Sequence, residues 1–155
     1  MYAGFNFRMS AVSAAIGLVQ LGKLERMNEA RRRIAGFYSS SLPGDLFVLP
    51  VEAPLRRHVF QMYTVRVRNF DRDEFVSRLA SRGVAASVHY SPPVHRQPYY
   101  ADAIRAGRAA VAGDLRITDE VSKSIVSLPI YPALTLEQAS RVVEIASECA
   151  RDLTR

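Results

Sequence analysis

The stretch Gly4-Phe5-Asn6-Phe7-Arg8-Met9-Ser10 runs directly into Ala11-Val12-Ser13-Ala14-Ala15-Ile16-Gly17-Leu18-Val19-Gln20-Leu21. Ser10 is typical of a helix N-cap, because its hydroxyl can accept a hydrogen bond from a backbone N–H two or three residues later. A helix N-terminus carries free N–H donors and a partial positive charge, which suit an anion such as a phosphate. Arg8 offers a planar fork that matches phosphate oxygens, and Asn6 can add a donor. The segment therefore indicates either an anion-binding loop or a helix start with a surface arginine.

Helical spacing of apolar residues continues from residue 10 to about residue 42, where a Pro-Gly-Asp turn follows. A single helix of ~33 residues would span ~50 Å, which is longer than a small domain is wide. We therefore expect this helix to bend, at Gly17 or Gly22, or to bridge two bodies. Without a second body, residues 10–42 are expected to expose apolar surface.

Beyond that turn the pattern alternates between strands and helices. We expect an extended connector over 46–57 and three strands, at 58–67, 84–90 and 124–130, of which the first is central. Helices are expected after Asp71 and Thr135, which have capping partners three residues later in Glu74 and Gln138. Between these two helices, we expect residues 91–100 to be irregular because they include three prolines. Residues 101–112 are expected to form a loose helix or a loop, and residues 119–123 a helical turn.

The predicted order gives an α+β fold: a long N-terminal helix plus a small three-stranded, mainly antiparallel sheet covered by helices. We divide the chain into 1–43, an interface loop with a long linking helix, and 44–155, a small C-terminal α+β domain. Cys149 falls on the apolar stripe of the last helix and is expected to be a core residue.

Composition narrows the function classes. The chain has 155 residues, 48% of them hydrophobic, and a formal net charge of +6. The basic residues are dispersed and nearly all arginine, with only Lys23 and Lys123 as lysines, which argues against a nucleic-acid binder. No apolar run approaches the ~20 residues of a membrane span, and no secretory signal is evident. A single cysteine excludes an internal disulfide. We expect a cytoplasmic protein.

The chain has three histidines, His58, His89 and His95, and the last two are further candidate functional residues. His89 and His95 flank a Pro-Pro turn, and their spacing does not fit a helical metal motif, so no metal site is expected. Their place in a loop is compatible with a ligand-facing role or with a structural one. No nucleophile elbow, P-loop or dinucleotide fingerprint is present, so the residues alone give no complete catalytic constellation.

Four ordered stretches together cover essentially the whole chain. They are residues 4–21, residues 31–38, the segment His89-Tyr90 with Pro93, His95 and Gln97-Pro98-Tyr99, and the segment Ser127-Leu128-Pro129-Ile130-Tyr131-Pro132 with Leu134, Thr135 and Gln138. In order and spacing they resemble signatures of the DegT/DnrJ/StrS sugar aminotransferases. Members of that family are pyridoxal-phosphate enzymes with the aspartate aminotransferase fold (fold type I).

This resemblance implies that the chain is the C-terminal portion of an aminotransferase, which moves an amino group, with glutamate the expected donor, to a nucleotide-linked keto-sugar. Asn6 and Arg8 would bind the phosphate of pyridoxal 5'-phosphate in a neighbouring subunit. His89, Tyr90 and His95 would lie toward the nucleotide-sugar substrate. The implied partner is a second copy, in a homodimer, or a separate large-domain polypeptide.

The resemblance also implies that the cofactor lysine lies before residue 4, in a large domain. Neither Lys23 nor Lys123 matches its position, so no catalytic residue is assigned here and the chain alone is expected to be inactive. Two alternatives stay open. One is a sugar dehydratase of the same fold, in which histidine replaces the lysine; the other is a non-catalytic dimerisation or regulatory fragment.

Overall fold

Alternating burial along Tyr63–Val67 places strand β2 at the centre of the sheet. Tyr63, Val65 and Val67 are buried, while Arg66 between them is exposed. In this computed structural model, which describes residues 7–154, β2 pairs antiparallel with β1 (Phe47–Val48) on one side and with β3 (Ile125–Leu128) on the other. The predicted central position of this strand is confirmed.

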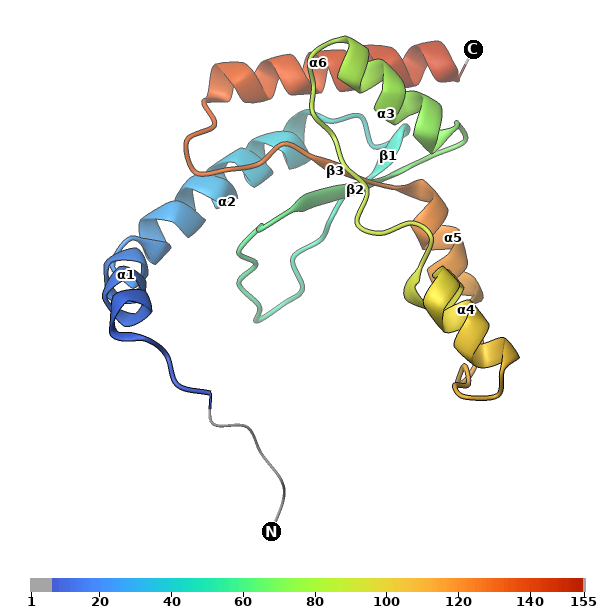
Figure 1. Ribbon diagram of the computed structural model, residues 1–155. Coiled ribbons are helices and arrows are strands. Elements are labelled where there is room, and N and C mark those ends of the chain that lie inside the picture. Colours follow the sequence, from blue (N-terminus) through green and yellow to red (C-terminus); the bar gives the residue numbers. More distant parts are fainter. Residues whose placement is uncertain (1–6, 155) are drawn as a thin grey trace.

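Most of the helices fall into two groups, one over one side of the sheet and one at its end (Figure 1). α6 (Leu136–Leu153) packs against both α2 (Leu24–Ser41) and α3 (Arg72–Ser81) to cover the core. α4 (Pro98–Arg105) and α5 (Arg116–Ser124) project from the other end of the sheet, next to the short 3-10 helix η1 (Val94–Arg96). α1 (Ala11–Leu21) lies at the far end of α2. The α+β fold with a three-stranded antiparallel sheet is confirmed.

The predicted helix caps are confirmed. The Ser10 hydroxyl accepts from the Ser13 N–H at 3.1 Å, and an Asp71 carboxylate oxygen accepts from the Glu74 N–H at 2.7 Å. Thr135 and Gln138 form a reciprocal capping box at the start of α6. Cys149 is buried on the core face of that helix, as expected.

The apolar N-terminal segment is two helices rather than one: α1 ends at Leu21, with Gly22 as its C-cap, and α2 begins at Leu24. α1 contains no buried residue, and its apolar side chains are open to solvent, with Val12 72% and Ile16 58% exposed. The expected exposed apolar surface is therefore present along α1. Asn28 is the first buried residue of α2, and the hydrophobic core begins in the second half of that helix with Ile34, Ala35 and Tyr38. The division of the chain at residue 43 stays a prediction.

The strand predicted at 84–90 is wrong. Only Ser87 pairs with the sheet, through an isolated bridge to Ser127. The preceding backbone donors are used locally, since the Val84 N–H bonds the Leu79 carbonyl and the Ala86 N–H bonds the Val84 carbonyl. The third strand is instead β1, inside the segment predicted as a connector.

Other boundaries also differ from the predictions. The central strand begins at Tyr63 rather than His58, because Phe60 has a φ of 45°, which interrupts extended backbone. The expected loose helix over 101–112 is α4, which ends at Arg105, and the expected turn over 119–123 belongs to the nine-residue α5. Within residues 7–154, no helix has the length and apolar character needed to cross a bilayer.

Candidate functional site

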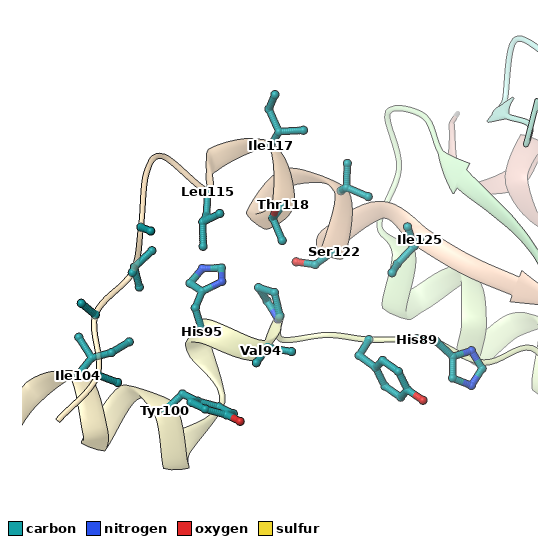
Figure 2. Close-up of a pocket in the computed structure, with 17 residues that line it drawn as sticks. His89, Val94, His95, Tyr100, Ile104, Leu115, Ile117, Thr118, Ser122 and Ile125 are labelled. Atoms are coloured by element: carbon teal, nitrogen blue, oxygen red, sulfur yellow. The ribbon is translucent and has the colours of Figure 1, made fainter. Parts of the chain in front are cut away.

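A cavity of about 740 Å³ lies between η1, α4, α5 and the loop that joins α4 to α5 (Figure 2). His89, Tyr90 and His95, the three residues assigned to the substrate side from sequence, all line it. Most of the remaining wall is aliphatic, and Thr118 and Ser122 of α5 add hydroxyl groups. The cavity therefore offers imidazoles and hydroxyls within a largely apolar wall.

His95 is held to α5 by a carboxylate. Its Nε2 lies 3.0 Å from Oδ1 of Asp119, and both side chains are mostly buried, at 17% and 18% exposed. The adjacent Arg96 binds the same carboxylate through two nitrogens, with Nε donating to Oδ1 at 2.6 Å and Nη2 donating to Oδ2 at 2.5 Å. One carboxylate of α5 thus anchors two consecutive residues of η1.

The same contacts set the charge of this group. The Arg96 guanidinium hydrogen-bonded to the carboxylate lowers the pKa of Asp119 to about 2, and the nearby His95 acts in the same direction. Asp119 is therefore ionised at neutral pH and can only accept hydrogen bonds.

His89 lies at the edge of the cavity nearest the sheet. Its Nδ1 is 3.2 Å from the Ser127 hydroxyl, which is in turn 2.9 Å from the Thr64 hydroxyl. The Tyr90 ring packs edge-on against the His89 ring, with 5.2 Å between centroids, and Tyr90 itself is 71% exposed. These contacts connect the cavity mouth to strands β2 and β3.

Of the two residues predicted to bind the cofactor phosphate, the structure describes Arg8, which lies away from the cavity. Arg8 is exposed on the segment that precedes α1, and Asn6 lies outside the described residues. Figure 1 places α1 and the α4–α5 pair at opposite ends of the molecule, so the structure does not bring Arg8 to the cavity. The N-terminus of α1 nevertheless presents backbone donors beside Arg8, a combination that fits a phosphate group.

Both lysines are exposed and lie outside the cavity wall, Lys23 as the N-cap of α2 and Lys123 near the end of α5. Across residues 7–154, no three His, Cys, Asp or Glu side chains come together in a way that could hold a metal ion.

The sequence did not identify Asp119 or Arg96 as residues of the site. Asp119 lies 24 residues after His95, and an acidic residue in the first turn of a helix is ordinary. The only available signal was a histidine next to an arginine in a proline-rich loop, which does not identify the carboxylate that both would bind.

Comparisons with known proteins agree with one another. A sequence model of the DegT/DnrJ/EryC1/StrS aminotransferase family matches residues 1–147. The chain is 37% identical to the "pleiotropic regulatory protein" of Geobacillus stearothermophilus over 96% of its length and 39% of that protein's. It is 36% identical to the dTDP-3-amino-3,4,6-trideoxy-alpha-D-glucose transaminase of Streptomyces venezuelae over 95% of its length and 37% of the transaminase.

Among solved structures, the crystal structure of S. venezuelae DesV superposes with a TM-score of 0.82 at 36% identity. That alignment covers 96% of this chain and 38% of the DesV chain. The chain thus spans less than two fifths of the length of these relatives.

Proposed function

Since the chain belongs to the DegT/DnrJ/EryC1/StrS aminotransferase family, we propose that it forms the C-terminal portion of a pyridoxal-phosphate-dependent aminotransferase. The complete enzyme transfers an amino group from an amino acid, with glutamate the expected donor, to a nucleotide-linked keto-sugar in polysaccharide or amino-sugar biosynthesis. The observation that carries this proposal is the family match over residues 1–147, and the relative named as a dTDP-sugar transaminase supports the substrate class.

In this proposal the cavity beside α5 faces the nucleotide sugar. His89 and His95 offer ring nitrogens, and Thr118 and Ser122 offer hydroxyls, which suit the hydroxyl groups of a sugar. The aliphatic part of the wall excludes water and packs against the apolar faces of the ligand. Tyr90, largely exposed at the mouth, is placed to contact a ligand that extends out of the cavity.

Arg8, together with Asn6, would hold the cofactor through its phosphate. Pyridoxal phosphate supplies the electron sink that amino-group transfer requires. An exposed arginine beside an exposed helix N-terminus can reach a phosphate carried by another body, either a second copy or a separate large domain. The exposed apolar side chains of α1 offer a packing surface for that second body.

A hybrid enzyme tests the proposal. We would replace the matching part of the S. venezuelae transaminase with this chain, then measure retained pyridoxal phosphate by absorbance and amino transfer by product analysis. The hybrid should retain cofactor and transfer the amino group, whereas the chain alone should do neither. Cofactor held by the chain alone and lost on Lys23→Ala or Lys123→Ala would contradict the missing-lysine assignment.

Arg8→Ala in that hybrid tests the phosphate role. A charge-assisted hydrogen bond is worth about 1.5–3 kcal/mol, so cofactor retention should weaken about tenfold or more. Arg26→Ala is the matched control, because Arg26 is an exposed arginine of α2. Equal retention in the two variants would remove Arg8 from the cofactor site.

A second candidate is a non-catalytic regulatory or dimerisation module. Its support is the name of the Geobacillus stearothermophilus relative and the position of both lysines away from the cavity. A hybrid that folds and dimerises but retains no cofactor would favour this function over the aminotransferase.

A further inference from the structure

The carboxylate of Asp119 joins two parts of the cavity wall that are far apart in the chain. η1 lies before α4 and Asp119 lies in the first turn of α5, so the contacts of His95 and Arg96 close a loop that contains α4 and the aliphatic segment after it. Both anchor points are themselves held by backbone bonds, from the Arg96 N–H to the Pro93 carbonyl at 2.9 Å and from the Asp119 N–H to the Leu115 carbonyl at 3.0 Å.

The chemistry of Asp119 restricts the neutral His95 ring to one tautomer. An ionised carboxylate can only accept, so the hydrogen in the 3.0 Å contact must reside on Nε2 of His95. In the neutral ring the other nitrogen, Nδ1, is then an acceptor. No group of the described residues forms a hydrogen bond with Nδ1, and Figure 2 shows the ring rising from η1 towards Leu115 and Thr118 in the cavity wall.

We propose that Asp119 is a positioning residue that fixes His95 with its hydrogen on Nε2, so that Nδ1 accepts a hydrogen bond from a sugar hydroxyl in the cavity. The nature of the ligand rests on the function proposed above, whereas the state of the ring does not. Arg96 supports this arrangement by binding both oxygens of the carboxylate and so orienting Oδ1 towards His95.

The other two histidines provide internal references. Nδ1 of His58 accepts from the Phe60 N–H at 2.8 Å, a group that can only donate, so Nδ1 of neutral His58 carries no hydrogen. Nδ1 of His89 faces the Ser127 hydroxyl, which can donate or accept, so its partner does not fix its state. Among the three, only His95 has a ring nitrogen paired with a carboxylate.

Nitrogen NMR of the full chain tests the positioning role directly. At about pH 8.5, where ordinary histidines are neutral, the His95 ring should show a hydrogen on Nε2 that exchanges slowly with water, because Asp119 holds it. The signal is assigned to His95 because it should be lost in the variant His95→Gln. Asp119→Ala should abolish the slow-exchanging hydrogen, whereas the matched variant Glu120→Ala, which removes an exposed carboxylate one residue further along α5, should preserve it.

Two results would overturn the positioning role. The first is that His95 of the wild-type chain shows no slowly exchanging hydrogen on Nε2; the second is that this hydrogen is still held in Asp119→Ala. The His58 signals report whether the variant is folded. If Asp119→Ala does not fold, the wild-type spectrum still decides, because it measures the same hydrogen directly.

Titration with UDP-glucose, dTDP-glucose and GDP-mannose separates this proposal from the proposed function. Binding of a probe should shift the Nδ1 resonance of His95 while the Nε2 hydrogen persists, and Asp119→Ala should weaken binding about fivefold to tenfold, the effect of about one neutral hydrogen bond. A held Nε2 hydrogen with no response to any probe contradicts the sugar-binding function and leaves the positioning role standing. Equal affinity in wild type and Asp119→Ala contradicts the positioning role.

Discussion

At the scale of single residues, Arg72 is a charged residue that is buried and hydrogen-bonded. It is only 8% exposed, and its guanidinium donates to the carbonyls of Ser122 and Ile125, at 3.1 and 3.3 Å, and to the Asp73 carboxylate. Arg72→Met would leave two carbonyls at the junction of α5 and β3 without this donor and should lower the free energy of unfolding by about 2–3 kcal/mol, measured by urea denaturation. Arg78→Ala, which removes an exposed pair with Glu74, should cost less than about 1 kcal/mol.

The lowered pKa of Asp119 predicts how the stability of the fold depends on pH. Its pKa is lowered from 3.8 to about 2 in the folded chain, so its contribution to stability is present above pH 4 and disappears as the pH falls through 2. Urea midpoints of wild type and Asp119→Ala should therefore differ at neutral pH and converge as the pH falls from about 4 to about 2. A difference that does not change over this range would show that the carboxylate acts through packing rather than charge.

At the scale of elements, the capping box of α6 is open to a direct test. Thr135→Ala removes the side-chain acceptor for the Gln138 N–H and should lower the free energy of unfolding by about 1 kcal/mol. Ser140→Ala, at an exposed interior position of the same helix, is the control and should have no such cost. The same loss in both variants would contradict a capping role.

The helix caps could be predicted from the sequence, because they depend on residues three positions apart. The sheet could be predicted only in part. β1 has two residues and is followed by Pro50, too little pattern to identify a strand, and Val84–Tyr90 has strand-like residues whose backbone donors are used in local turns. For the cavity, His89, Tyr90 and His95 were found through a family resemblance, whereas Asp119 was missed because its partners are distant in sequence.

At the scale of the whole molecule, α1 forms an apolar arm outside the core. We expect the chain to self-associate through it at high concentration, measurable by sedimentation velocity. The double substitution Val12→Glu and Ile16→Glu should reduce that association and change the free energy of unfolding by less than about 0.5 kcal/mol, because both side chains are exposed. Gln20→Glu, an exposed substitution that adds charge to the same helix, should leave the association largely unchanged. If the double substitution has no effect, the arm is not the contact surface.

The break at Gly22 has a consequence for the chain in solution. Because no side chain of α1 is buried, α1 can unwind without opening the core, whereas amides on the core face of α6 are released only when the whole fold opens. Deuterium uptake followed by mass spectrometry should therefore be fast for peptides from residues 11–21 and slow for peptides from residues 139–150. A body that docks on the arm would slow the first group and leave the second unchanged, so the exchange rate of this one helix can report docking when no activity can be measured.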